Sequence, residues 1–181
     1  MQNQSFYILD SEEIVAGSNK LMLHLFNAVG SGLTVHVWSL EIMSKSDVAV
    51  TGVVSARFDL LRTNSIGTGG VTAGYAENVT TKTQINPFDT KAATLNGLIT
   101  ARSSPAGGAN TTAYITKTYA QSEETNASAI SNLNQNHLEN ITRHKSLEVN
   151  PGEGLLIRQG SVASLNSYSF RLVFSTGESD N

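Results

Sequence analysis

Residues 167–175 read SYSFRLVFS, and their pattern indicates the fold class of the chain. Tyr168, Phe170, Leu172 and Phe174 alternate with other residues, most of them polar, at a period of two. That period is the spacing of side chains that share one face of a β-strand. We therefore predict a strand with one buried face and one mostly solvated face.

The same alternation occurs earlier in the chain, at residues 54–60. It places Phe58 on an apolar face and Arg57 and Asp59 on the opposite, polar face. Short apolar runs bounded by glycine and proline turns predict further strands. These runs cover residues 97–102, 113–120, 141–149 and 154–159.

Two longer segments, residues 21–29 and 33–43, are apolar on both faces, as expected for strands in the middle of a sandwich. Only Gly30-Ser31-Gly32 separates them. A connection this short predicts a hairpin. Residues 122–137 are the only helix candidate, and their many asparagines, serines and threonines favour a long loop equally.

The composition agrees with an all-β chain. Charged residues make up only 15% of the 181 residues, and serine, threonine, asparagine and glycine, about 40% of the chain, supply the polarity and favour strands and turns. About eight short strands predict a β-sandwich, with the jelly roll as the first expectation and an immunoglobulin-like sandwich as the alternative. We expect one domain over residues 11–181, preceded by an amino-terminal arm over residues 1–10.

No pattern in the sequence predicts catalysis, so we expect a protein that is not an enzyme and has no catalytic residues. The spacing of His36, Trp38 and Glu41 does not predict a metal site, because an indole cannot coordinate a metal and a regular strand places Glu41 on the opposite face. His24 and His36 alone would leave a metal under-coordinated, and the chain has no cysteine. We therefore expect no metal and no cofactor, and interpret these histidines as hydrogen-bonded residues within strands.

Nucleic acid and membrane are also unexpected partners. The net charge is -3, with lysine and arginine scattered singly, whereas a nucleic-acid-binding protein needs a basic patch. Gly67-Thr68-Gly69-Gly70 lacks the lysine and hydroxyl residue of a phosphate-binding loop. No stretch approaches the roughly 20 apolar residues of a membrane helix.

Three segments resemble small tailed-phage virion proteins. They are FDLLRT at residues 58–63 leading into GTGG at 67–70, PFDT at 87–90, and LEVNPGEGL at 147–155, which contains the PGEGL turn. The resemblance spans about two thirds of the chain and rests on strand and turn signatures, not on chemical motifs. It implies a capsid decoration or cement protein that binds the major capsid protein and other copies of itself as a homo-oligomer. The alternative is a tail-associated or receptor-binding module.

The amino-terminal arm is the predicted partner contact. Phe6, Tyr7, Ile8 and Leu9 form an apolar run between polar residues, which is typical of an arm that adds a strand to a neighbouring protein. An edge strand of the chain's own sandwich is the equal alternative. As a bacteriophage structural protein, the chain would be made in the host cytoplasm and reside in the virion.

Overall fold

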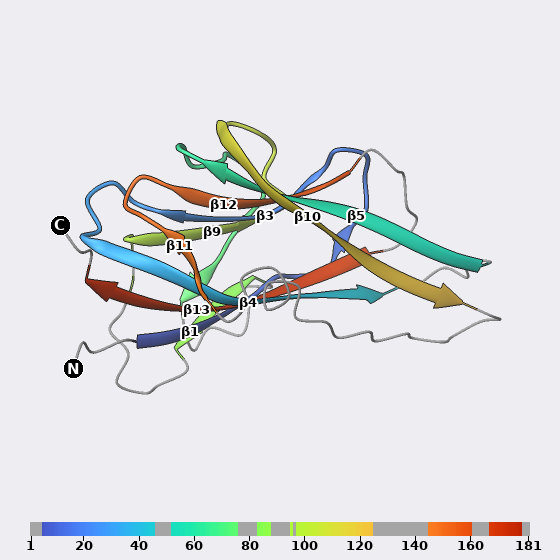
Figure 1. The fold of residues 1–181 in the computed structure, drawn as a ribbon, viewed down its shortest axis with the longest axis horizontal. Helices are drawn as coiled ribbons and strands as arrows, with labels where there is room; N and C mark the ends of the chain where they lie inside the picture. Colours follow the sequence, from blue (N-terminus) through green and yellow to red (C-terminus); the bar gives the residue numbers. More distant parts are fainter. Residues whose placement is uncertain are drawn as a thin grey trace.

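The computed structural model describes residues 5–45, 52–75, 83–87, 95, 97–124, 145–160 and 167–178. Every regular element in these residues is a β-strand. The strands form two sheets that pack face to face, one above the other in Figure 1. The predicted all-β sandwich is therefore confirmed. Within the described residues, no helix is long and apolar enough to cross a membrane.

The first sheet has seven strands, and its longest members are β4 and β13. Its pairs are antiparallel except β7 with β8, and β2 pairs with β13 outside the main order. In spatial order the strands are β11 (Leu147–Val149), β4 (Leu33–Lys45), β13 (Ser167–Glu178), β1 (Ser5–Asp10), β8 (Gln84–Pro87) and β7 (Gly74–Tyr75), with β2 at Ile14–Val15.

The second sheet has six strands, all of them antiparallel to their neighbours. The predicted strand at residues 154–159 coincides with β12. In spatial order the strands are β10 (Thr111–Glu124), β5 (Gly52–Thr63), β12 (Gly154–Gln159), β3 (Leu21–Asn27), β9 (Ile99–Ser103) and β6 (Val71–Thr72).

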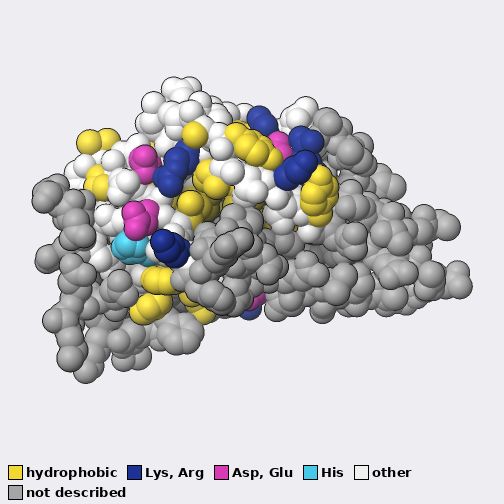
Figure 2. Space-filling view, in the orientation of Figure 1, with side chains coloured by type: hydrophobic (Ala, Val, Ile, Leu, Met, Phe, Trp, Pro, Cys, Tyr) yellow, Lys and Arg dark blue, Asp and Glu magenta, His cyan; other side chains and the backbone are white. Residues whose placement is uncertain are grey.

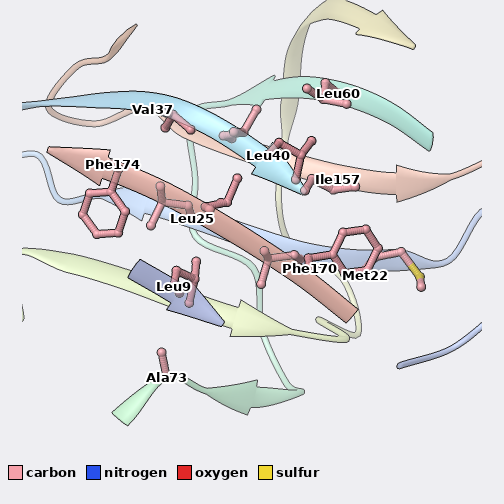
Figure 3. Packing of buried hydrophobic residues seen from close by; sticks show 14 of the residues in the cluster. Leu9, Met22, Leu25, Val37, Leu40, Leu60, Ala73, Ile157, Phe170 and Phe174 are labelled. Atoms are coloured by element: carbon pink, nitrogen blue, oxygen red, sulfur yellow. The ribbon is translucent and has the colours of Figure 1, made fainter. Parts of the chain in front are cut away.

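A continuous hydrophobic core lies between the two sheets, and Figure 3 shows part of it. Phe170 and Phe174 of β13 point into this core together with Leu60 of β5 and Leu25 of β3. Phe58 meets Phe170 edge to face, with 5.5 Å between the ring centroids. The predicted buried faces of residues 168–174 and 56–60 are therefore confirmed.

The predicted hairpin between residues 21–29 and 33–43 is wrong. β3 belongs to the six-stranded sheet and β4 to the seven-stranded sheet, so the turn at residues 28–32 carries the chain from one layer to the other. The buried Asn27 side chain holds this crossing, because its Nδ2 donates hydrogen bonds to the carbonyls of Leu33 (2.7 Å) and Val149 (3.0 Å). A short glycine turn is compatible with either path, and the anchoring contact comes from a distant part of the chain.

The predicted face of Glu41 is wrong, because β4 contains a β-bulge. Ser39 pairs with Val173 and Val37 pairs with Phe174, which leaves Trp38 as the extra residue. Val37 lies in the core before the bulge and Leu40 after it, so the alternation changes phase at Trp38. As a result, Glu41 shares the outer face with His36, and its Oε2 lies 3.8 Å from an Arg171 nitrogen on that face.

The predicted arm lies within the sandwich. Residues 5–10 form β1, which pairs with β13 on one side and β8 on the other, so the strand is inside the sheet and not at its edge. The boundary expected after residue 10 is therefore absent: residues 5–10 belong to the same domain as the strands that follow. Residues 1–4 lie outside the described residues.

The helix candidate also begins in a strand. Residues 122–124 are the end of β10 and pair with residues 52–54 of β5. A helix starting at Ser122 is therefore excluded, because these backbone groups belong to the ladder between β10 and β5. Residues 125–137 of the candidate lie outside the described residues.

Two connections cross the outer face of the six-stranded sheet. Residues 64–70 lead from β5 to β6, and residues 104–110 lead from β9 to β10. Each segment crosses over the strands β12 and β3, which lie between the strands it connects. They are held to each other where the Thr68 N–H donates to the Gly107 carbonyl (2.7 Å) and the Ala106 N–H to the Thr68 carbonyl (2.7 Å). The first of these segments covers the outer face of β3 in its middle, where the Gly67 N–H donates a hydrogen bond to His24 Nδ1.

Candidate functional site

The outer face of the seven-stranded sheet carries a row of side chains on four neighbouring strands. The backbone register sets Phe6 of β1 opposite Ser175 of β13, Ser175 opposite His36 of β4, and His36 opposite Glu148 of β11. Each of the four is the outward partner of a buried neighbour in its strand, such as Tyr7 beside Phe6 and Val37 beside His36. This row forms the floor of the candidate site.

Trp38 completes the site because it lies two residues after His36 in β4 and so faces the same side of the sheet. Its indole Nε1–H donates a hydrogen bond to the Ser175 hydroxyl (2.8 Å), which fixes the ring over β13. The ring lies between two others, with centroid distances of 6.5 Å to Phe6 and 6.4 Å to His36. We call Phe6, His36 and Trp38 the aromatic patch.

The edge of the aromatic patch is polar. His36 Nδ1 lies 3.1 Å from the Ser146 hydroxyl and 4.0 Å from Glu148 Oε1. Glu148 is mostly exposed. Figure 2 shows a histidine and an acidic side chain beside hydrophobic side chains on one flank of the molecule. The arrangement has an apolar centre and a polar rim, which is the usual anatomy of a protein-binding surface.

The structure divides the four predicted contact residues between two environments. Tyr7 and Leu9 are buried in the core, and Tyr7 stacks on Phe174 at 5.3 Å between centroids. Phe6 and Ile8 face outward, and Phe6 remains 36% exposed. Only these two are therefore placed to touch a partner, and they would do so as side chains on a sheet face and not as a donated strand.

Trp38 is the contact residue that sequence reasoning missed. The sequence pattern places it on the face of His36 and excludes it as a metal ligand, but does not indicate that its ring is a binding surface. It is 36% exposed, as is Phe6, so two large rings that touch each other share one outer face. Aromatic residues contribute strongly to binding energy at protein interfaces.

His24 lies on the other sheet, on its outer face under the crossing segments. The Gly67 N–H donates to His24 Nδ1 (3.2 Å), so Nε2 carries the proton of the neutral ring and donates to the Thr63 hydroxyl (2.8 Å). The interpretation of His24 as a hydrogen-bonded histidine within a strand is confirmed. In the part of the chain that the structure describes, no three His, Asp or Glu side chains gather closely enough to hold a metal ion.

We expect the free energy of unfolding to fall as the pH drops from about 6.5 to about 4. Burial lowers the pKa of His24 from 6.5 to about 4, and the Arg102 guanidinium acts in the same direction. Between these pH values the unfolded chain binds a proton at His24 that the folded chain does not bind. The neutral, buried His24 therefore contributes up to about 3 kcal/mol of stability, which is fully present above pH 6.5 and is lost as the pH falls towards 4. Denaturant melts across this pH range measure the loss.

The matched control for this pH dependence is His24→Gln, whose amide does not titrate. The slope of stability against pH between 4 and 6.5 should become shallower in this variant than in the parent. An unchanged slope would assign the effect to other groups. Nuclear magnetic resonance of the His24 ring gives the pKa directly.

Comparison with known proteins gives no relatives for this chain: no family model, no curated protein and no solved structure matches it.

Proposed function

We propose that the chain is a structural protein of a virus particle, a decoration or cement protein that docks on the capsid shell through the aromatic patch. The observation that carries the proposal is the contact between Phe6 and Trp38, two partly exposed rings on an outer sheet face. The partner is the protein of the shell, and the bound state is repeated by the symmetry of the particle.

The geometry of the aromatic patch supports binding. The patch offers aromatic surface, the imidazole of His36 and the carboxylate of Glu148 at 4.0 Å from it. It lies on regular strands of a sandwich, so its shape is largely formed before binding and little entropy is lost in ordering it. Many modest contacts of this kind on one particle give a strong total attachment.

The resemblance to tailed-phage virion proteins supports the head shell as the partner. Its segments map onto β5 and the crossing segment after it, onto Pro87 at the end of β8, and onto residues 147–155 from β11 to the start of β12. These are scaffold elements that include Glu148 at the edge of the patch but none of its three rings. The resemblance therefore supports the class of protein, while the patch supports the mode of contact. A tail-associated or receptor-binding module is the alternative that the following experiment separates.

Purified protein should rebind particles that have been stripped of it, in a saturable and regular array. Replacing Phe6 and Trp38 together with serine should weaken this rebinding by about 30-fold or more, because the loss of interface aromatic anchors costs about 2 kcal/mol or more. Co-sedimentation measures the affinity, and electron microscopy of the reconstituted particles locates the protein.

Val29→Ser is the control, because Val29 is an apolar side chain 79% exposed in the turn at residues 28–32 and is not part of the patch. It should leave rebinding unchanged. Deleting residues 1–10 is a poor test, since it removes an inner strand of the sheet. Density only at the tail, or binding to host cells without binding to the shell, would contradict the decoration function and support the alternative.

A further inference from the structure

A second group of polar and aromatic side chains lies on the outer face of the six-stranded sheet. Three strands contribute to it in register: Asp59 of β5 pairs with Lys117 of β10 on one side and with Arg158 of β12 on the other. Next along the same strands, Tyr119 pairs with Arg57. Their neighbours in the chain, such as Phe58 and Ile157, point into the core, so this group faces outward.

Asp59 organises the two arginines. Its side chain is only 4% exposed, and its Oδ1 lies 3.1 Å from Arg57 Nε while its Oδ2 lies 3.1 Å from Arg158 Nη2. Arg57 Nη2 also donates to Oδ2 at 3.3 Å. Gly160 packs against the Arg57 side chain so closely that a Cβ at this position would lie 2.9 Å from Arg57 Nε. Both guanidiniums are therefore fixed in place before any partner arrives.

The arginines retain donors for a second acceptor. A guanidinium carries five N–H groups, and the contacts to Asp59 use only Nε and Nη2 of Arg57 and Nη2 of Arg158. Both side chains stay partly open to solvent, at 42% and 37% exposure. Asp59 cancels one positive charge, so with Lys117 the group carries a net charge of +2 on a chain whose total is -3.

Tyrosines flank the charged centre. Tyr119 lies beside Arg57, and Tyr114 pairs with Leu61, the next outward residue of β5 beyond Asp59. They are 47% and 56% exposed. Figure 2 shows basic side chains around an acidic one on the upper part of the molecule, with hydrophobic side chains next to them. We call Arg57, Lys117, Arg158, Tyr114 and Tyr119 the arginine–tyrosine face.

We propose that the arginine–tyrosine face is a second docking surface, and that its partner is a protein segment that presents aspartate or glutamate side chains. The charge of the face selects the partner, because guanidiniums pair with carboxylates through two parallel hydrogen bonds. Tyrosine and arginine are also among the residues that are enriched at the energetic centres of protein interfaces. Two copies meeting through this same face would bring their arginines together, which disfavours a symmetric self-contact.

This surface is independent of the aromatic patch, which lies on the other sheet. A test needs only the isolated protein and poly-L-glutamate as the probe, with fluorescence anisotropy at low ionic strength as the measurement. The variant replaces Arg57 and Arg158 with glutamine. It also replaces Asp59 with asparagine, because the buried Asp59 carboxylate would otherwise be left without the two cations that pair with it. We expect binding to weaken by about tenfold or more relative to the parent protein.

Arg62→Gln is the matched control, because it changes the net charge by the same amount and removes an arginine that pairs with Glu153 outside the face. It should leave binding within about twofold of the parent. A separate variant, Lys117→Gln with Tyr119→Ala, changes only exposed side chains and should also weaken binding. Circular dichroism checks that each variant is folded.

Three outcomes would overturn the proposal. The first is no binding of poly-L-glutamate by the parent protein. The second is an equal loss in the triple variant and in Arg62→Gln, which would mean unspecific attraction. The third is binding of polygalacturonate, a carboxylated polysaccharide, without binding of poly-L-glutamate, which would assign the face to an acidic glycan. None of these outcomes depends on whether the protein rebinds virus particles.

Discussion

Replacing Phe170 with alanine is expected to lower the free energy of unfolding by roughly 3–5 kcal/mol. The ring is fully buried in the centre of β13 and meets Phe58 edge to face at 5.5 Å. Its removal leaves a cavity between the sheets that the surrounding strands, each held by ladders on both sides, can close only in part. Chemical denaturation of the two proteins measures the difference.

The neighbouring Arg171 provides the control. It points to the outer face, where its Nε lies 2.7 Å from Asp10 Oδ1, and its side chain is 40% exposed. Arg171→Ser removes this ion pair but creates no cavity, so the expected loss is about 1 kcal/mol or less. Equal losses at positions 170 and 171 would contradict the assignment of the two faces of β13.

Gly154→Ala is expected to lower the free energy of unfolding by roughly 3 kcal/mol. A methyl group at this position would overlap the Thr63 hydroxyl, lie 2.6 Å from His24 Nε2 and lie 2.9 Å from the Leu25 carbonyl oxygen. The first two atoms form the hydrogen bond that holds His24, so the substitution must break this bond or displace β12. Thermal or denaturant melts give the loss.

Gly30→Ala is the comparison for this effect, because a Cβ there meets no atom within 4 Å. The stability of this variant should stay within about 0.5 kcal/mol of the parent. The pKa of the His24 ring offers a second readout in Gly154→Ala, because a displaced and more hydrated imidazole titrates closer to its ordinary value. A variant as stable as the parent, with an unchanged His24 pKa, would contradict the described packing.

The strands with one apolar face were predictable from the sequence. In β13 and β5 the alternation of apolar and polar residues follows the pleat, so the period alone identifies the buried side chains. The period does not indicate to which of the two sheets a strand belongs. β3 and β4 were expected to be apolar on both faces, whereas His36 and Glu41 lie on the outer face of β4. The placement of the two strands in separate sheets depends on contacts such as that of Asn27 with Val149, which lies far away in the chain.

The two candidate surfaces show a similar division. Phe6 was predicted as a contact residue from its apolar run, but only the register of β1 against β13 separates it from the buried Tyr7. The face of Trp38 follows from its spacing to His36, whereas the outward position of Glu41 depends on the bulge, which the sequence of β4 does not indicate. The polar face of Arg57 and Asp59 was correctly predicted, whereas Arg158 and Lys117 join it through the pairing of β12 and β10 with β5, which local patterns do not encode.

The position of β13 determines when the seven-stranded sheet can form during synthesis. β13 lies between β4 and β1, which do not pair with each other, so these two strands have no common partner until residues 167–178 have left the ribosome. The seven-stranded sheet therefore stays in two parts, β1 with β8 and β4 with β11, until residues 167–178 are available to join them. Nascent chains in this state are the ones most exposed to aggregation and to capture by chaperones.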